Sequence, residues 1–356
     1  MPKVSVIIPV YNAAAFLREC LDSVRDQRLS DMEVLCIDAG CTDESPAILR
    51  QYAKIDPRFH VLSGYGRLDA GSARNIGLSE AKGDYLSFLD SDDFFHRDML
   101  YDAWKKASAD RSDIVIFKAR QLDMRSGMIS DMPWSLRLGN CPRKSPFSPE
   151  EMAGTLFNSF ENWTWNKLFR REFIQEAGIT FQAIARTNDM AFTCQALARA
   201  KLICCLNKCY VTYRIGTGTS LQQTNDRSPT CFWEAYRETR HRLMTDGVYE
   251  TYRESFCKAV LLGTIYNLNS IREEAVRNQV LSLVQQQSAQ LGLLPEAFSH
   301  PRHRQWCSCL LSGKPIPPLS RRESLQAFLS DYGIGYAVKY AIQKIISRFI
   351  KQKWIS

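Results

Sequence analysis

Short apolar runs alternate with helical patterns over the first hundred residues of the chain. Four of these runs have the length of a buried strand: 4–10, 33–37, 59–62 and 85–89. Three segments between them repeat their apolar residues at the spacing of a helix: 16–24, 48–52 and 73–81. Strand and helix in regular alternation predict an α/β fold, in which a mixed, mostly parallel sheet has helices on both faces.

The predicted strands end in polar residues, which is where ligands bind in open sheets of this kind. The second strand continues into 38–43, where Gly40 can adopt a positive φ and the polar residues can cap a helix, so ordinary capping explains this segment as well as ligand binding does. In 90–93, by contrast, three of the four residues are Asp. Their repulsion has to be relieved by a cation, by protonation or by solvent. Two carboxylates and the phosphates of a nucleotide are a usual ligand set for a divalent ion.

The alternation of strands and helices stops near residue 220. Apolar residues between 256 and 268 recur at helical spacing, which predicts a helical extension. The Pro-rich segment 313–318 cannot be helical and is predicted to be a linker, and Ser320 with Glu323 has the pattern of a capping box. The predicted parts are an α/β domain over 1–218 with halves at 1–95 and 96–218, a helical extension over 219–312, and a linker with terminal helices over 313–356.

The terminal segment 334–356 combines an apolar stripe with positive charge. Five apolar residues fall on one helical stripe: Val338, Ile342, Ile345, Ile346 and Phe349. Five basic residues surround it: Lys339, Lys344, Arg348, Lys351 and Lys353. A basic amphipathic helix of this kind suits the surface of an anionic membrane, but a helix docked on the domain with a solvated basic face has the same pattern. The sequence leaves both alternatives open.

Composition places the chain among globular proteins. Of its 356 residues, 45% are hydrophobic and 24% are charged, which excludes a disordered or fibrous chain. The net charge of +8 favours a polyanionic, phosphorylated or membrane partner without choosing among them. No apolar run approaches the length of about 18 residues that a transmembrane helix needs, and 4–10 is too short for a signal peptide. We therefore expect a cytoplasmic protein, with peripheral contact at the inner face of the cytoplasmic membrane if the terminal helix binds lipid.

Twelve cysteines are scattered along the chain and are expected to be buried thiols. Two imidazoles and two thiols stand close together in the sequence at His300, His303, Cys307 and Cys309. Their spacing lacks the separated ligand pairs of structural zinc sites, so we interpret this segment as a polar surface loop.

Four blocks of sequence together resemble the family 2 glycosyltransferases, which have the GT-A fold. The blocks are 4–12 (VSVIIPVYN), 38–43 (DAGCTD), 73–78 (ARNIGL) and 83–93 (GDYLSFLDSDD), in the order and at the spacing of the family. The resemblance continues through 165–171 and 187–192 and so covers about the first 215 residues. It implies an inverting enzyme of the type that builds bacterial cell-surface polysaccharides.

The resemblance assigns roles in nucleotide binding to individual positions. Pro9, Tyr11 and Asp38 resemble the pocket of the nucleotide base, with Tyr11 stacking on the base and Asp38 accepting a hydrogen bond from it. Arg74 resembles the basic residue near the nucleotide. The implied donor is a nucleotide-diphosphate sugar, with a UDP-sugar as the first expectation.

The resemblance also implies the chemistry. Asp90 and Asp92 match the DxD motif, whose carboxylates bind Mn²⁺ or Mg²⁺ and, through the ion, the diphosphate. The metal neutralises the negative charge that builds on the leaving phosphate oxygen. Asp189 matches the general base that takes the proton of the acceptor hydroxyl. Without the resemblance, Asp189 would be interpreted as an acid at the start of a helix, where the helix dipole favours it.

The expected acceptor is a glycan or a lipid-linked glycan. Trp163, Trp165 and Asn166 either line the acceptor site or belong to the core. A non-catalytic sugar-nucleotide or glycan-binding protein on the same fold is the alternative function. A nucleotidyltransferase would be expected to have a Gly-rich loop after the first strand, and 9–15 has no glycine. Nucleic acid is not an expected partner, because no basic stripe with interleaved aromatic residues occurs outside the terminal segment.

Three departures from the family pattern concern the same site. Ala39 stands where a second Asp is usual, which removes one hydrogen bond to the base and weakens the expected preference for uridine. The segment 67–69 replaces the usual Asn and Gly, and Asn188 replaces the Glu that usually precedes the base. None of these changes removes an indispensable charge, so we expect an active enzyme.

Overall fold

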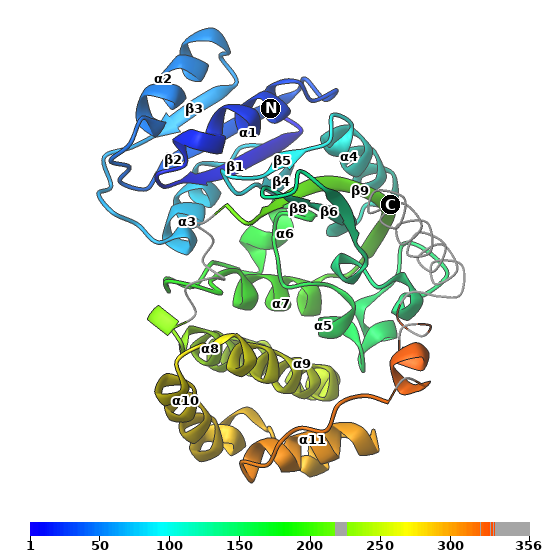
Figure 1. Ribbon diagram of the computed structural model, residues 1–356. Helices are drawn as coiled ribbons and strands as arrows, with labels where there is room; N and C mark the ends of the chain where they lie inside the picture. The colour runs from blue at the N-terminus through cyan, green and yellow to red at the C-terminus, as the bar shows by residue number, and fades with distance from the viewer. Residues whose placement is uncertain (218–225, 321, 328, 330, 332–356) are drawn as a thin grey trace, which may run out of the picture.

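The computed structural model describes residues 1–217, 226–320, 322–327, 329 and 331, and its elements are shown in Figure 1. The strands are β1 (Val4–Val10), β2 (Met32–Asp38), β3 (Phe59–Leu62), β4 (Tyr85–Phe88), β5 (Phe94–Phe95), β6 (Ile114–Asp123), β7 (Ile129–Met132), β8 (Lys167–Arg170) and β9 (Ile203–Ile215). The α-helices are α1 (Ala14–Arg25), α2 (Ser45–Ile55), α3 (Ala70–Glu80), α4 (Met99–Asp110), α5 (Leu156–Ser159), α6 (Arg171–Glu176), α7 (Asp189–Arg199), α8 (Cys231–Thr245), α9 (Tyr249–Ser270), α10 (Glu274–Gln287) and α11 (Pro301–Leu311). Short 3₁₀ helices are η1 (Pro133–Ser135), η2 (Leu138–Asn140), η3 (Pro149–Met152), η5 (Ser288–Leu291) and η6 (Pro295–Ala297).

The strands form one mixed sheet in the order β3-β2-β1-β4-β8-β6-β9-β5, with β7 paired to β6. Strands β1 to β4 pair in parallel, as the alternation predicts. Beyond β4 the pairing changes, because β8 enters the sheet in the opposite direction and is antiparallel to both β4 and β6. Strand β5 is antiparallel to β9, and β9 is parallel to β6. The predicted parallel character therefore describes the first half of the sheet better than the second.

Two hydrophobic clusters cover the two faces of the sheet. Val6 and Ile8 of β1 share one cluster with buried side chains of α1, α2 and α4. Ile7, between them, shares the other cluster with buried side chains of α3 and α7. Successive side chains of a strand point to opposite faces, so β1 is buried on both sides and its sequence is apolar throughout.

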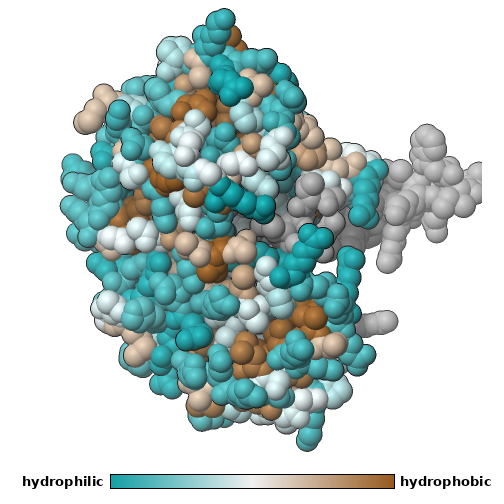
Figure 2. All heavy atoms as spheres, turned by 90° about the vertical axis from the view of Figure 1, so that its left-hand side faces the viewer, coloured by the Kyte–Doolittle hydropathy of each residue, from teal (hydrophilic) through white to brown (hydrophobic). Residues whose placement is uncertain are grey.

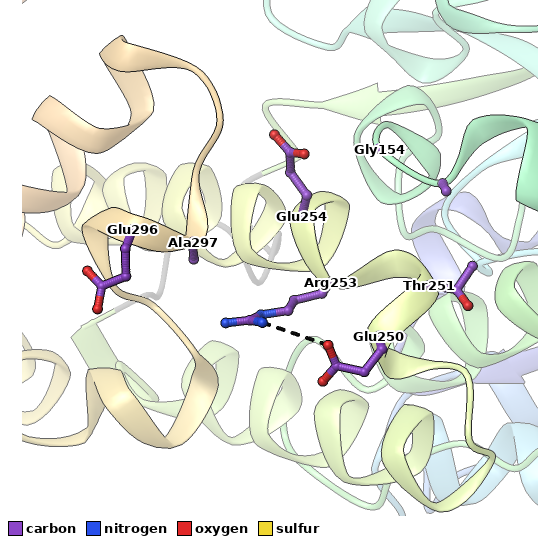
Figure 3. Close-up of a pocket in the computed structure, with 8 residues that line it drawn as sticks. Gly154, Glu250, Thr251, Arg253, Glu254, Glu296 and Ala297 are labelled. Atoms are coloured by element: carbon purple, nitrogen blue, oxygen red, sulfur yellow. Dashed lines mark ion pairs between the residues drawn. The ribbon is translucent and has the colours of Figure 1, made fainter.

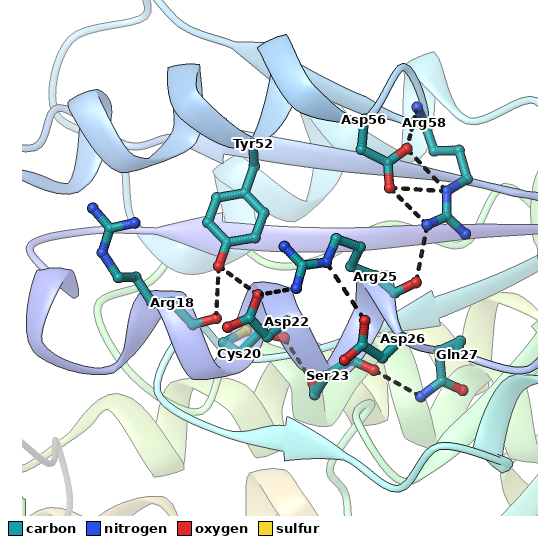
Figure 4. Close-up of polar contacts among 10 residues, drawn as sticks. All are labelled: Arg18, Cys20, Asp22, Ser23, Arg25, Asp26, Gln27, Tyr52, Asp56 and Arg58. Atoms are coloured by element: carbon teal, nitrogen blue, oxygen red, sulfur yellow. Dashed lines mark hydrogen bonds and ion pairs between the residues drawn. The ribbon is translucent and has the colours of Figure 1, made fainter.

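A polar network fastens α1 and α2 to each other and to the sheet (Figure 4). The Tyr52 hydroxyl of α2 donates to Asp22 Oδ1 of α1 at 2.7 Å. Arg58, just before β3, donates from Nη2 to Asp56 Oδ2 at 2.6 Å and to the Arg25 carbonyl at 2.9 Å. These bonds hold the helices in one position over β2 and β3, and so they also fix the loops that follow β1 and β2.

Helix α8 packs on α7, on the side of the sheet that α3 covers, and α9 packs on α8 with α10 and α11 beyond it (Figure 1). Buried side chains of α9, among them Phe256 and Val260, belong to the same cluster as Ile7 and Phe88 of the sheet. The predicted helical extension is thus a stack of helices that continues the core of the α/β part. The boundaries placed at 218 and 312 stay predictions.

The predicted surface loop near residue 300 is wrong, because α11 makes this segment a helix. Pro301 occupies its first turn, and His300 caps it by accepting a hydrogen bond from Arg302 N at Nδ1, at 3.2 Å. Cys307 is fully buried in the core. His300 therefore has a capping role and Cys307 a packing role.

Two further observations concern the surface. Among the residues that the structure describes, no helix is long and apolar enough to cross a membrane. Figure 2 shows one face of the molecule, on which apolar residues form small patches in a largely hydrophilic surface. The predicted basic amphipathic helix at 334–356 lies outside the described residues, so the membrane contact stays a prediction.

Candidate active site

The acidic residues at 90–93 form a tight turn at the end of β4. Leu89 N donates to the Ile7 carbonyl at 3.1 Å, which extends the pairing of β4 with β1. Asp93 N donates to the Asp90 carbonyl at 3.0 Å, which closes the turn. We call residues 90–93 the acidic turn. It lies at the carboxyl edge of the sheet, where the sequence predicts a ligand site.

Asp93 and Arg214 form the buried floor of the acidic turn. Asp93 is fully buried, and its Oδ1 accepts a hydrogen bond from Arg214 N at 2.8 Å, while Oδ2 has no hydrogen-bond partner among the described residues. The Arg214 guanidinium, also buried, donates to the Asp92 carbonyl and to the Glu19 carboxylate. Burial raises the pKa of Asp93 well above its usual range, and the charges of Asp92 and Asp90 add to the effect. The sequence did not reveal Arg214, which lies over a hundred residues further along the chain.

Asp92 carries negative charge that the protein does not balance. Burial raises the pKa of Asp92 to about 6, and the charge of Asp90 contributes, while Arg214 opposes the shift. Carboxylates so close together fit a hard divalent cation, which would relieve their repulsion. Within the described part of the chain, no three His, Cys, Asp or Glu side chains are grouped to hold a metal ion. Asp90 and Asp92 would thus supply part of the coordination, and phosphates or water the rest.

Arg74 of α3 links the acidic turn to the second half of the sheet domain. Its Nη2 donates to Asp90 Oδ1 at 2.5 Å, and its Nη1 donates to Asn188 Oδ1 at 2.7 Å. The guanidinium is buried and lies 5.5 Å from the ring centroid of Phe181. Because Asn188 immediately precedes Asp189, one guanidinium holds the acidic turn and the predicted base close together.

Asn188, which replaces the Glu of the family pattern, keeps an acceptor oxygen for Arg74 without adding a charge. Arg74 therefore forms an ion pair with Asp90 and only a hydrogen bond with residue 188. We call the surroundings of Asn188 and Asp189 the corner. Helix α3 approaches it closely at Gly71, where a Cβ would lie 2.2 Å from the Gln182 carbonyl. A glycine at the start of α3 is thus required for the contact that brings Arg74 to Asn188.

Asp189 is the first residue of α7 and lies two residues after Thr187, whose φ of 58° is in the left-handed region. Burial raises the pKa of Asp189 to about 6, and Asp90 adds to the shift, while Arg74 and Lys167 oppose it. A helix N-terminus alone would lower the pKa of a carboxyl group. The raised value therefore reflects burial, and it leaves a carboxylate that is ionised at neutral pH and still basic enough to accept a proton.

Lys167 is a buried cation near Asp189 that the sequence analysis missed. The side chain is 0% exposed, and Nζ donates to the Trp163 carbonyl at 2.6 Å and to the Glu161 carbonyl and Asn166 Oδ1 at 2.7 Å each. Three acceptors match the three N–H groups of an ammonium. Burial lowers the pKa of Lys167 to about 7, against the opposing charges of Glu161 and Asp189. Leu168 and Phe169 directly after Lys167 were the one local sign that this lysine begins a buried strand.

The predicted base pocket lies where β1 and β2 end side by side. Pro9 is buried in the end of β1, whereas Tyr11 is 40% exposed and can present its ring to a ligand. Asp38 Oδ1 accepts hydrogen bonds from Gly40 N at 3.1 Å and from Cys41 N at 2.9 Å. One oxygen of the Asp38 carboxylate thus shapes the turn after β2.

Two of the positions that differ from the family pattern, Ala39 and the segment 67–69, meet at this pocket. The guanidinium of Arg67 lies 4.9 Å from the ring centroid of Tyr11, and Leu68 N donates to the Ala39 carbonyl at 3.2 Å. Gly40, with a φ of 85°, allows this close approach, because a Cβ there would lie 2.7 Å from a backbone oxygen of the loop before α3. The loop that contains Arg67 therefore forms one wall of the predicted base pocket.

Of the three residues considered for the acceptor site, two belong to the core. Trp165 is 3% exposed, and Asn166 is fully buried. Asn166 Nδ2 donates to the carbonyls of Phe117 and Ser135, at 3.2 and 3.1 Å, and so it joins β6 to the segment before β8. Trp163 is half-buried and can contact a ligand.

A separate cavity of about 450 Å³ opens between α9 and the segment around η6 (Figure 3). Its lining residues are Ala153, Gly154, Glu250, Thr251, Arg253, Glu254, Glu296 and Ala297. Arg253 and Glu250 form an ion pair across 3.7 Å. None of the residues predicted to bind donor, metal or proton lines this cavity, so it is distinct from the candidate active site.

Known proteins resemble this chain in sequence and in fold. Residues 5–178, which include the acidic turn and Arg74, match glycosyl transferase family 2. Over these residues the chain belongs to this family. EpsH of Bacillus subtilis (strain 168) is 27% identical to this glycosyltransferase over 267 residues, or 73% of this chain and 75% of EpsH. EpsJ of the same organism, an uncharacterized glycosyltransferase, is 32% identical over 218 residues, or 60% of this chain and 61% of EpsJ.

Solved structures resemble this glycosyltransferase over most of its length. TarS 1-349 of S. aureus, in a crystal structure with UDP, has a TM-score of 0.66 at 20% identity and covers 87% of each chain. The mannosyltransferase PcManGT of Pyrobaculum calidifontis, in complex with GDP-Man and Mn²⁺, has a TM-score of 0.54 at 19% identity over 95% of this chain and 86% of PcManGT. At these identities the likeness concerns the fold, and it confirms the predicted GT-A type of α/β fold followed by helices.

Proposed function

We propose that this family 2 glycosyltransferase moves a sugar from a nucleotide-diphosphate sugar to a hydroxyl of a glycan or lipid-linked glycan, with inversion at the anomeric carbon. The bridge that Arg74 makes between Asp90 and Asn188 carries the proposal, because it holds the acidic turn and Asp189 in one site. The ligands of the structural neighbours support a nucleotide-sugar donor, since TarS binds UDP and PcManGT binds GDP-Man.

Asp189 is proposed to be the general base. Its carboxylate, with a pKa of about 6, accepts the proton of the acceptor hydroxyl as the oxygen attacks the anomeric carbon from the face opposite the leaving group. A single displacement needs only one base and inverts the configuration, so an α-linked donor gives a β-linked product. Arg74 opposes the protonation of Asp189 and so keeps the base in its active form.

The donor is proposed to lie along the carboxyl edge of β1, β2 and β4. Tyr11 stacks on the base, and Pro9 and Asp38 form the floor and wall of its pocket. Arg74, already paired with Asp90, lies where the diphosphate would reach the acidic turn. A UDP-sugar is the first choice, and the loop that contains Arg67 and contacts Ala39 gives this pocket its own shape.

Asp90 and Asp92 are proposed to hold Mn²⁺ or Mg²⁺. The residues fit such an ion, because the carboxylates of the acidic turn repel one another and the pKa of Asp92 is raised by burial and by Asp90. When bound, the ion supplies a positive charge that stabilises the leaving diphosphate. The Mn²⁺ in the PcManGT complex supports this choice.

Donor hydrolysis and transfer, measured with a panel of UDP-, GDP- and dTDP-sugars and Mn²⁺, test the proposal. We expect turnover with one donor class, which is lost in Asp92→Asn and Asp189→Asn and kept in Asp31→Asn. Asp31 is a suitable control, because its exposed carboxylate pairs only loosely with Lys3, at 3.8 Å. If the wild type binds UDP but turns over no donor, and Asp189→Asn behaves in the same way, the protein is a binding protein and the proposal fails.

Peripheral membrane contact through 334–356 is part of the proposal and has its own test. The basic stripe in this segment supports it. We expect the full chain to sediment with anionic liposomes and a chain ending before residue 334 to remain in the supernatant. Equal sedimentation of the two chains would exclude this segment as the anchor.

A further inference from the structure

Lys167, the first residue of β8, is a buried cation with no carboxylate partner among the described residues. Its side chain is 0% exposed. Its three hydrogen bonds end on uncharged acceptors, which are the carbonyls of Glu161 and Trp163 and Oδ1 of Asn166. Burying an ammonium group costs free energy that an ion pair usually offsets in part. Packing alone therefore does not account for a lysine at this position.

Strand β8 places Lys167 on the side of the sheet that α7 covers. Leu168 packs in the hydrophobic cluster of α1, α2 and α4, whereas Phe169 packs in the cluster of α3 and α7. Successive side chains of a strand point to opposite faces, so Lys167 shares the face of Phe169. Asp189, the first residue of α7, is one of the groups whose charge raises the pKa of Lys167. The ammonium thus lies on the α7 side of β8, within electrostatic reach of Asp189.

The acceptors of Lys167 all belong to the segment that precedes β8. We call residues 161–166 the anchored loop. Lys167 Nζ donates to the Glu161 carbonyl at 2.7 Å and to the Trp163 carbonyl at 2.6 Å. Between these two residues, Asn162 Oδ1 accepts a hydrogen bond from Cys194 Sγ of α7 at 3.3 Å. The loop is therefore held by Lys167 and is joined to the helix that begins with the proposed base.

The charge of Lys167 also acts on Asp189. Burial and the charge of Asp90 raise the pKa of Asp189, and the charges of Arg74 and Lys167 oppose this shift. Arg74 already forms an ion pair with Asp90, whereas Lys167 has no ion pair among the described residues. The titratable groups that act on Lys167 are Glu161, Asp189, Cys194 and Cys205. Asp189 is the one of these four with a proposed part in the reaction.

We propose that Lys167 is a positioning residue for the transfer reaction: it fixes the anchored loop against α7 and so holds Asp189, as an ionised carboxylate, ready to accept the proton of the acceptor hydroxyl. A catalytic group that is held in its reactive orientation by its surroundings needs little rearrangement when the substrate binds. Lysine suits the position because one group supplies both three donors and a charge. The inference rests on the proposed function, because it takes Asp189 as the general base.

Hydrogen–deuterium exchange of the full chain tests the anchoring without any substrate. In Lys167→Met, which removes the ammonium, backbone amides of 161–166 and of 189–195 in α7 should exchange about tenfold faster or more. The exchange of β1 reports whether the variant is folded. Lys258→Met is the matched control, because Lys258 of α9 is half-buried and burial lowers its pKa as well, but it is not among the groups that act on Asp189. It should leave both segments unchanged.

The pH dependence of kcat/KM, with the donor that the wild type turns over, tests the effect on Asp189. Burial lowers the pKa of Lys167 to about 7, so its ammonium is charged in the acidic range where Asp189 titrates. Lys167→Met and Lys167→Gln both remove this charge and should move the acidic limb up by as much as about one pH unit. Lys167→Arg keeps the charge and should leave the limb in place.

The two neutral variants separate the anchoring from the charge. Lys167→Gln keeps N–H donors for the anchored loop, so its kcat should fall less than the drop of about tenfold expected for Lys167→Met, and KM for the donor should stay within about twofold in both. The inference is overturned if exchange in Lys167→Met matches the wild type or if neither neutral variant moves the limb. If this happens while the wild type turns over a donor and Asp189→Asn does not, the proposed transfer stands and only the role of Lys167 is wrong. A wild type that turns over no donor contradicts the proposed function and this role with it, whatever the exchange shows.

Discussion

The acidic turn and the corner around Asp189 each contain a carboxyl group with a pKa of about 6, but their surroundings differ. The turn has three carboxyl groups and two arginines. One of these, Arg214, donates to the backbone carbonyl of Asp92. The corner has one carboxylate between Arg74 and Lys167, both of which favour its ionised form. Charge at the corner is thus balanced from within the protein, whereas charge at the turn is not. This difference suits a site in which the turn binds a cation and a diphosphate and the corner handles one proton.

Asp92→Asn should have the largest effect on the rate of transfer, because it removes a proposed cation ligand from the acidic turn, where negative charge is not balanced by the protein. We expect the rate of transfer to fall by about 10³-fold or more, since a metal contributes several kcal/mol to the stabilisation of the leaving group. The affinity for UDP in the presence of Mn²⁺ should fall as well. Isothermal titration with UDP, with and without Mn²⁺, and initial rates measure both. An Asp92→Asn enzyme whose UDP affinity still rises with Mn²⁺ would separate this residue from the cation.

Asp189→Asn should affect only the chemical step. We expect kcat to fall by about 10³-fold, within the range usual for the loss of a general base, and the affinity for UDP to stay within about twofold. This pair of measurements distinguishes the corner from the turn, where both quantities change. Loss of UDP affinity in Asp189→Asn would show that nucleotide binding and proton transfer are not separated between the turn and the corner.

Arg214→Met should reduce stability, because it removes the guanidinium that donates to the carbonyl of Asp92 at a buried site. Leaving a buried acceptor without its donor costs about 1–3 kcal/mol. Urea unfolding followed by circular dichroism measures the change, and Arg18→Met, at an exposed position of α1, is the control. Equal unfolding midpoints for the two variants would contradict a role of Arg214 in stabilising the acidic turn.

The pH dependence of kcat/KM reports the state of the corner. A carboxyl with a raised pKa of about 6 is protonated below that pH, so the rate should fall about tenfold per pH unit on the acidic side of pH 6. Mn²⁺ near the corner favours the ionised form, so saturating Mn²⁺ should move this limb to lower pH. A rate that is independent of pH between 5 and 7 at Mn²⁺ concentrations well below saturation would argue against Asp189 as the base.

Asn188→Asp should have the smallest effect. A second carboxylate at Arg74 competes for its charge and places a negative group beside Asp189, so the acidic limb should move up by less than about one pH unit. The same substitution at exposed Asn207 should not move it. A shift to lower pH would mean that Arg74 does not control the ionisation of Asp189.

The sequence predicted well the features that depend on neighbouring residues. The spacing of apolar residues over a few positions predicts strand β1 and helix α1. The polar residues that follow β1, β2 and β4 are likewise visible in short stretches of sequence. Roles for Arg74 and Asp189 were predicted through the family resemblance. Arg214 and Lys167 were not, because a charged residue in a strand gives no local sign of the partner it meets. The segment at α11 was misinterpreted for a related reason, since its polar residues cap and pack against groups that are distant in sequence.

The amino-acid sequence by itself determined the βα alternation, the site at the carboxyl ends of the strands and the carboxylates available to it, because these depend on local periodicity and on the parallel pairing that it requires. Only the tertiary structure decided how the charges are shared: that Arg74 divides its bonds between Asp90 and Asn188, that Lys167 is buried beside Asp189, and that Trp163, Trp165 and Tyr213 stack. Burial and pairing set the pKa of a group and the exposure of a ring, and both depend on residues that the fold brings together from opposite ends of the domain.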